Sequence, residues 1–187
     1  MDPNVRLTSA QSPTMTKEFA AMRNIPYHEA IDSLMYTMLG TRPDICFAIQ
    51  TVSCFNSKPG LTHWEAIKQI FRYLLGTKEL WLGYGRQQRE MVGYGDADGS
   101  MAEDRKVISG YAFIINGRAV SWSTKQQTII SLSTTESKYI AATYAAKEAL
   151  WLCSLISQLF GITLDMMTLF CNNQFAIALT KEHQYHA

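Results

Sequence analysis

The chain has 187 residues, which is enough for one sizeable hydrophobic core or two small ones. Hydrophobic residues make up 47% of it and charged residues 18%, an ordinary composition for a globular protein. The net charge is +1, so no overall basic field would draw the chain to nucleic acid, and such a partner would need a local basic patch. Two sets of residues could supply that patch: Lys68, Arg72 and Lys78, or Arg105, Lys106, Arg118 and Lys125.

No apolar run approaches the ~20 residues that a membrane-spanning helix needs, so we expect no membrane contact. The N-terminus lacks both the basic start and the apolar stretch of a signal peptide. No two of the four cysteines have CxxC spacing, and the four histidines form no metal-finger pattern with them. We therefore expect reduced, mostly buried thiols in an intracellular protein of the cytoplasm or nucleus.

The first part of the chain predicts a lead-in followed by helices. Residues 1–24 are rich in Pro, Ser, Thr and Asn, which favours a disordered lead-in. Residues 25–85 predict a small helical segment, because three stretches carry apolar residues at helical spacing. The first of these helices ends at Gly40, and the third begins at a capping-box pattern, Thr62 to Glu65, and ends at Gly76. Each helix has one apolar stripe that must be buried against a partner.

Beyond residue 80 the apolar period changes from helical to alternating. Asn116-Gly117 separates two alternating runs, which is a strong hairpin signal. A long helix is predicted from Ser133 to about Phe160, with Gly161 as its stop. The predicted fold class is therefore α/β, a mixed sheet with a long helix, preceded by a small helical segment. The predicted strands are residues 80–84, 91–96, 111–115, 119–123 and 167–171, with a further strand or the approach to the long helix at 128–132 and a last helix from residue 175.

Several short motifs follow one another along this second part. They are Gly95-Asp96-Ala97-Asp98, Asp104-Arg105-Lys106, Ser109-Gly110-Tyr111, Ser121-Trp122-Ser123, Ser133-Thr134-Thr135-Glu136-Ser137-Lys138-Tyr139-Ile140-Ala141 and Cys171-Asn172-Asn173-Gln174. In this order they resemble the ribonuclease H domain of copia-type retrotransposon Pol polyproteins. The segments Ile25-Pro26-Tyr27, Thr41-Arg42-Pro43-Asp44-Ile45 and Arg72-Tyr73-Leu74-Leu75-Gly76-Thr77 resemble the end of the reverse transcriptase in the same family.

The resemblance covers roughly residues 25–187 and implies a division of the chain. Residues 25–85 would be a remnant of the reverse transcriptase tail or connection, and residues 91–187 a ribonuclease H-like domain that is truncated at its C-terminus. We expect this truncation to leave an apolar surface exposed, for a packing partner or for the helices of residues 28–77 to cover. The catalytic acids of the polymerase lie upstream in the family and are absent from this chain, so the resemblance excludes a polymerase.

The resemblance also implies an RNA–DNA hybrid as substrate and Mg²⁺ as cofactor. Such a site cuts RNA by attack of water on phosphorus, with two Mg²⁺ ions held by carboxylates. Of the four acids of the family, Asp96 matches the first, whereas Lys138 and Asn172 stand at the second and third positions, and the fourth would lie beyond Ala187. An ammonium group cannot coordinate a metal, and an amide oxygen ligates without charge. We therefore expect Mg²⁺ to bind weakly at Asp96 or not at all.

Two further acids could substitute for the missing ligands. Asp98 would share the face of Asp96 if the strand continued, although a turn acid is the alternative interpretation. Glu136 stands near Lys138, but with Ser133 it forms a capping-box pattern that would engage it at the start of the helix. Asn172 could likewise cap the helix that follows it.

Three functional hypotheses remain open at this stage. The leading one is a degenerate ribonuclease H-like domain without nuclease activity. The second is a weak Mg²⁺-dependent hybrid endonuclease that uses Asp96, Asp98 and Glu136. The third is a non-catalytic module that binds nucleic acid or a protein through its sheet, and its nucleic-acid form would weaken as salt rises.

Overall fold

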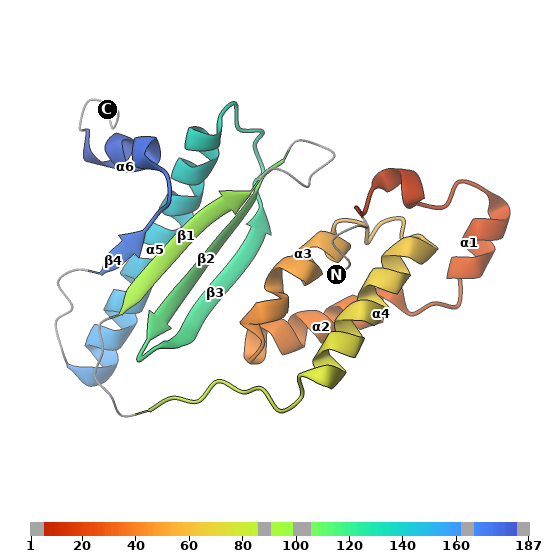
Figure 1. Cartoon of the computed structure of the whole chain (residues 1–187), viewed down its shortest axis with the longest axis horizontal. Coiled ribbons are helices and arrows are strands. Elements are labelled where there is room, and N and C mark those ends of the chain that lie inside the picture. Colours follow the sequence, from red (N-terminus) through yellow and green to blue (C-terminus); the bar gives the residue numbers. More distant parts are fainter. Residues whose placement is uncertain (1–5, 86–90, 99–105, 162–166, 183–187) are drawn as a thin grey trace. The chain divides into compact units, whose positions relative to one another are not determined.

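The computed structural model describes residues 6–85, 91–98, 106–161 and 167–182. The chain divides into two compact units, Met1–Leu82 and Gly83–Ala187, which are considered separately below (Figure 1). The described part of the N-terminal unit is helical, and the C-terminal unit combines one sheet with two helices. None of the described helices is both long enough and apolar enough to cross a membrane.

The N-terminal unit buries the apolar stripes of its helices against one another. Ile31, Leu34, Ile49 and Ile67 come from three different helices, and each side chain is at most 1% exposed. This mutual burial is what the single-stripe pattern of each helix requires. The elements of the unit are η1 (Ser9–Gln11), α1 (Thr16–Met22), α2 (Tyr27–Gly40), η2 (Pro43–Ile45), α3 (Cys46–Ser53) and α4 (Leu61–Gly76).

The structure differs from the sequence-based expectation at the start of the chain. The expected lead-in of residues 1–24 contains η1 and α1 within its described part, and Leu7 is buried there. The buried imidazole of His63 ties the start of η1 to α4, because its Nε2 lies 3.1 Å from the carbonyl oxygen of Thr8. Its Nδ1 accepts a hydrogen bond from the backbone N–H of Gly60 at 2.9 Å, so Nε2 carries the proton and donates a hydrogen bond to the carbonyl oxygen of Thr8. His63 rather than a Thr62–Glu65 capping box therefore supports the first turn of α4.

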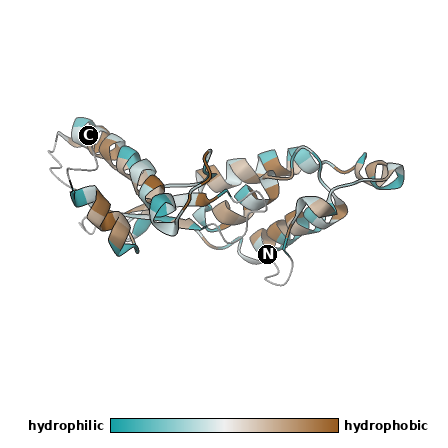
Figure 2. Cartoon of the chain, turned by 90° about the horizontal axis from the view of Figure 1, so that it is seen from above, coloured by the Kyte–Doolittle hydropathy of each residue, from teal (hydrophilic) through white to brown (hydrophobic). Residues whose placement is uncertain are grey.

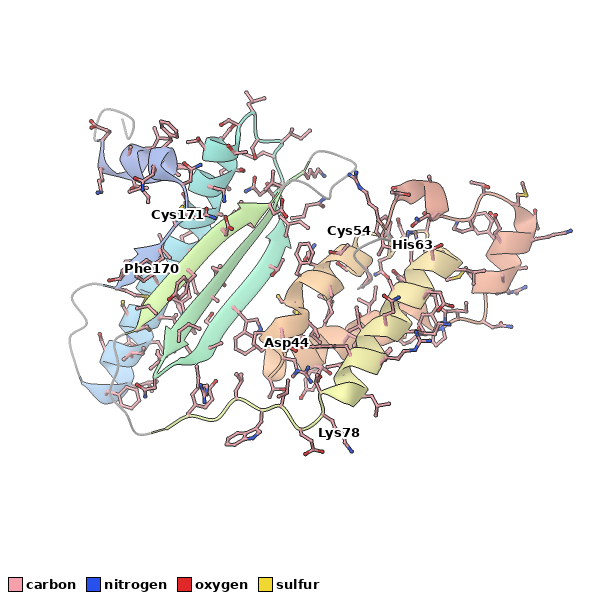
Figure 3. All side chains as sticks on the ribbon, in the orientation of Figure 1. Asp44, Cys54, His63, Lys78, Phe170 and Cys171 are labelled. Atoms are coloured by element: carbon pink, nitrogen blue, oxygen red, sulfur yellow. The ribbon has the colours of Figure 1, made fainter. Side chains whose placement is uncertain are left out.

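A buried arginine ties η2 to the end of α4. The guanidinium of Arg42 donates from Nη2 to Asp44 Oδ2 at 2.7 Å and to Thr77 Oγ1 at 2.6 Å. The hydroxyl of Tyr73 donates to the same carboxylate oxygen at 2.8 Å, and Figure 3 labels Asp44 within this cluster. Hydrogen bonds from Arg42 hold the pKa of the Asp44 carboxyl below its usual value.

The C-terminal unit is built on a four-stranded mixed sheet in the order β3-β2-β1-β4 (Figure 1). β1 runs antiparallel to β2 and parallel to β4, and β2 and β3 form a hairpin. At the hairpin, Asn116 and Gly117 both have positive φ angles, 54° and 73°, as a two-residue turn of the primed type requires. The elements are β1 (Val92–Asp98), β2 (Ile108–Ile115), β3 (Arg118–Gln126), α5 (Thr134–Phe160), β4 (Thr168–Phe170) and α6 (Gln174–Lys181).

Close packing of α5 against β1 forms the core of this unit. Gly95 faces the helix, and a Cβ atom at this position would lie 3.2 Å from Cβ of Ala145. Ala145 and Phe113 are fully buried, and Ala141 is 1% exposed. A Cβ atom at Gly93 would overlap the ring of Phe113. Small residues on both surfaces therefore let the helix lie directly on the strand.

The predicted α/β class, hairpin and long helix are confirmed, and the differences are local. The long helix ends at Phe160, and Gly161 takes the left-handed conformation with φ of 63°. Residues 80–84 and 128–132 form no strand, although the Tyr84 hydroxyl donates to the carbonyl oxygen of Ala119 at 2.7 Å. The cysteines are free as expected, but only Cys46 is buried. Burial of most of the thiols was therefore a wrong expectation.

The Arg42–Asp44 pair predicts an acid-sensitive contribution to the stability of the N-terminal unit. Because the folded-state pKa of Asp44 is depressed, the stabilisation is present above the ordinary carboxyl pKa of about 3.9 and is lost as pH falls through the folded-state value. Asp44→Asn should lower the free energy of unfolding at pH 6, and its difference from wild type should shrink at pH 3. Urea titrations at both pH values measure this. The exposed Asp32→Asn is the control, and an equal Asp44→Asn deficit at both pH values would contradict the prediction.

The contact between Gly93 and Phe113 predicts that the strand tolerates no side chain at this position. Gly93→Ala should destabilise the C-terminal unit by roughly 1–3 kcal/mol, the usual cost of overpacking a core. Gly110→Ala is the matched control in the neighbouring strand, because a Cβ atom there would meet its nearest neighbour, the carbonyl oxygen of Ser123, at 3.6 Å. Urea unfolding of both variants gives the comparison. Equal stability would mean that the ring of Phe113 moves aside without cost.

Candidate functional site

The candidate site lies where β1 and β4 stop pairing. Their parallel register ends at Tyr94 and Phe170, and Asp96 and Asn172 each follow two residues later. Successive side chains of a strand alternate between its faces, so Asp96 emerges on the same face as Tyr94. The carboxyl ends of adjacent parallel strands are a common location for ligand sites in α/β sheets.

Lys138 reaches this point from the second turn of α5. A buried glutamine fixes the start of that helix, because Gln127 Nε2 donates to the backbone carbonyl of Ser137 at 2.9 Å and to Ser109 Oγ at 2.7 Å. The Ser131 hydroxyl donates to the other end of the same amide, Gln127 Oε1, at 2.9 Å. Gln127 was not among the predicted site residues. The local sequence around Gln127 does not predict its role, because the residues to which it bonds lie up to 18 positions away.

The three predicted positions come together in a closed ring of hydrogen bonds. Lys138 Nζ donates to Asp96 Oδ1 at 2.5 Å and to Asn172 Oδ1 at 2.6 Å. Asn172 Nδ2 donates to Asp96 Oδ2 at 3.4 Å, and the backbone N–H of Ala97 donates to Asp96 Oδ1 at 2.8 Å. The Lys138 side chain is 17% exposed and that of Asp96 is 59% exposed. The expected proximity of the three residues is confirmed, whereas their roles as metal-ligand positions stay a prediction.

The two possible substitute acids, Asp98 and Glu136, lie at the end of β1 and in the first turn of α5. Asp98 ends β1 on the exposed face, two residues beyond Asp96. The Glu136 carboxylate accepts the backbone N–H of Leu132 at 2.7 Å, while its own N–H donates to Ser133 Oγ at 3.1 Å. The predicted cap by Ser133 is therefore confirmed, whereas Glu136 reaches back to the backbone N–H of Leu132 and not to that of Ser133, as a capping box would require. Over the described residues, no three or more His, Cys, Asp or Glu side chains are grouped closely enough to hold a metal ion.

The neighbouring asparagine caps the next helix. Asn173, not Asn172, accepts the backbone N–H of Ala176 at 2.8 Å at the start of α6. Asn172 is thus free to turn toward Lys138. Figure 3 labels Phe170 and Cys171 just before this turn.

An exposed apolar surface was predicted for this unit, and several large apolar side chains are indeed exposed. Tyr94 and Phe170 stack with ring centroids 5.3 Å apart, and each is 49% exposed. Figure 2 colours the ribbon by residue hydropathy, and its helices carry both hydrophobic and hydrophilic segments. Exposed large hydrophobic residues of α5 and α6 include Tyr144, Leu150, Trp151, Leu159, Phe160 and Phe175. What covers them stays a prediction.

The basic residues considered for a nucleic-acid patch are partly engaged. Lys68 Nζ lies 2.5 Å from Glu65 Oε1, and Lys78 Nζ lies 3.8 Å from Glu79 Oε1. The Arg118 guanidinium donates to the carbonyl oxygen of Gly83 at 3.0 Å. Other members of the predicted set are Arg72, Lys106 and Lys125, and Arg105, with Asp104 of the same motif, lies outside the described residues.

Comparison with known proteins gives several relatives along most of the chain. It is 43% identical over 187 aligned residues to the retrovirus-related Pol polyprotein from transposon TNT 1-94 of Nicotiana tabacum, which covers 98% of this chain and 14% of that polyprotein. It is 32% identical over 184 residues to the Pol polyprotein from transposon RE2 of Arabidopsis thaliana, covering 95% of this chain and 12% of that polyprotein. The chain thus spans a small part of these polyproteins.

A shorter relative matches nearly throughout its own length. The Secreted RxLR effector protein 161 of Plasmopara viticola is 44% identical over 133 residues, which is 70% of this chain and 94% of that protein. No protein-family model matches the chain. No solved structure matches it either.

Proposed function

We propose that this chain, which is similar along most of its length to parts of retrovirus-related Pol polyproteins from transposons, belongs to their copia-type family and carries a degenerate ribonuclease H-like unit that does not cleave RNA–DNA hybrids. The mixed sheet supports this proposal, because β1 pairs antiparallel with β2 and parallel with β4 while α5 packs on one face. The proposal takes the N-terminal unit as the remnant of the reverse transcriptase tail. Hybrid substrate and Mg²⁺ dependence belong to the family, and their loss is what we propose for this chain.

The observation that carries the proposal is the ammonium group of Lys138 between two oxygen ligand positions. Mg²⁺ prefers hard oxygen ligands in octahedral geometry, and a two-metal hydrolase holds its ions with several carboxylates. Here Asp96 contributes one carboxylate and Asn172 one neutral amide oxygen, and both already accept hydrogen bonds from Lys138. A protonated lysine has no lone pair to offer a metal. These three residues do not fit a magnesium ion.

The weak-nuclease alternative has less support from the same geometry. It requires Asp98 or Glu136 as a substitute ligand, and the Glu136 carboxylate is engaged by the backbone N–H of Leu132. Asp98 alone would leave two carboxylates beside the ammonium of Lys138. The binding-module alternative, in which the sheet contacts nucleic acid or a protein, requires no metal ligand at Asp96. Hybrid binding measured at increasing salt tests that alternative separately.

The proposal predicts that the unmodified chain does not cleave a labelled RNA–DNA hybrid in Mg²⁺. Lys138→Glu combined with Asn172→Asp should bind Mg²⁺ at least tenfold more tightly, as measured by calorimetry. The double change returns two acids and removes a positive charge worth about 4 kcal/mol against each ionic charge at ~4 Å and an effective dielectric near 20, before screening. The same double variant carrying Asp96→Asn is the control and should lose the gain.

The cleavage assay needs the single variant Asp96→Asn beside the wild-type chain. Cleavage that persists in Asp96→Asn would come from a contaminating nuclease and would not count against the proposal. Robust cleavage by the wild-type chain that Asp96→Asn abolishes would overturn it and establish the weak-nuclease alternative.

A further inference from the structure

We infer that the Lys138 ammonium is the structural cation of this site and holds β1, α5 and the connection between β4 and α6 together without a metal ion. The inference takes one premise from the proposed function, which is that relatives would hold a metal ion at this site. The ammonium bonds one oxygen from each of two elements other than its own, Asp96 of β1 and Asn172 beyond β4. These residues lie 42 and 34 positions from Lys138 in the sequence.

Few backbone hydrogen bonds join β4 to β1 near the site. β4 has three residues, and its ladder with β1 consists of three residue pairs that end at Tyr94 and Phe170. Beyond that pair, Asp96 and Asn172 are linked directly by a single long hydrogen bond of 3.4 Å. The two hydrogen bonds from Lys138 are much shorter, so among the described contacts they form the closest link between Asp96 of β1 and Asn172 beyond β4. Hydrogen bonds with an ionised donor are stronger than neutral ones.

The charges of the ring are balanced without any ion. Asp96 carries −1, Lys138 carries +1 and the Asn172 amide is neutral, so the cluster as a whole is neutral. A carboxylate at position 172 could accept from Lys138, but it could not donate to Asp96 as the Asn172 amide does. Lys138 and Asn172 thus close the ring with Asp96 through hydrogen bonds alone. The ring needs neither a second carboxylate nor a metal ion. We expect the stability of the unit to be independent of divalent metal.

The test is thermal unfolding of the full chain with excess Mg²⁺ or with chelator, at matched ionic strength. Lys138→Met should lower the melting temperature of the C-terminal unit by roughly 4–8 °C, and Mg²⁺ should not restore it. Lys147→Met, the same change at an exposed position of the same helix, is the matched control and should leave the melting temperature near that of wild type. Wild type should melt at the same temperature in both solutions.

A second substitution distinguishes a lost cation from a lost side chain. Lys138→Glu removes the cation but supplies a metal ligand beside Asp96, so this variant should be destabilised in chelator and should recover several degrees in Mg²⁺. Hydrogen exchange should be faster over residues 92–98 and 168–182 in both Lys138 variants, with residues 27–40 of the N-terminal unit as an internal control. The same measurement reports on the site even if one variant unfolds too readily for a clean melting curve.

The inference is overturned if Lys138→Met melts and exchanges like wild type, or if Mg²⁺ stabilises wild type. It is also overturned if Asp96→Asn costs as much in the Lys138→Met background as in wild type, since partners in one ion pair must show coupling. The Lys138→Met and coupling measurements, made in chelator, are separate from the cleavage assay. An unaffected Lys138→Met would overturn this inference and leave the proposed lack of cleavage as it stands, whereas hybrid cleavage by wild type would remove the proposed function and leave the measured coupling of Asp96 with Lys138 unchanged.

Discussion

Direct contact between α5 and β1 is the constraint on which the C-terminal unit depends. A Cβ atom at Gly95 would lie 3.2 Å from Cβ of Ala145, so the helix lies too close to the strand to accept a side chain there without a shift. Lys138 lies seven residues before Ala145 and so projects from nearly the same side of the helix, two turns earlier. The short distance between helix and strand lets its flexible stem pass β1 and bring Nζ to Asp96. Larger residues at this contact would lift the helix and move the ammonium away from both oxygens.

The two partners of the Lys138–Asp96 ion pair differ in solvent exposure, and this difference determines how much the pair contributes to stability. Lys138 is 17% exposed and Asp96 is 59% exposed, so most of the desolvation falls on the ammonium. A lysine can bury its stem while its charged end reaches a partner, which limits that cost. Replacing such a pair by well-packed apolar residues is often neutral, whereas removing one partner leaves the other uncompensated. The pair therefore links α5 to β1, and its presence alone does not imply unusual stability.

Local signals in the sequence predicted the elements, and long-range contacts account for what they missed. The Asn116-Gly117 turn, the Ser133 cap and the Gly161 stop each depend on a few adjacent residues, so pattern alone located them. The position of η1 involves His63, whose partner Thr8 is 55 residues away. Gln127 likewise depends on partners distant in the sequence, because it donates hydrogen bonds to Ser109 of β2 and to the backbone of Ser137 in α5. The proximity of Asp96, Lys138 and Asn172 came from family resemblance, because no local pattern relates positions so far apart.

The alternation of β1 explains how a fold can stay intact while its site changes. Gly93, Gly95 and Ala97 are buried, whereas Tyr94, Asp96 and Asp98 are exposed. Because neighbouring residues of a strand point to opposite faces, the residues that pack against α5 are different from those that face the site. A substitution at Asp96 or Asp98 therefore does not alter the residues of β1 that pack against the helix. The same separation lets an ammonium occupy a ligand position, provided that its charge finds a partner, and Asp96 is that partner.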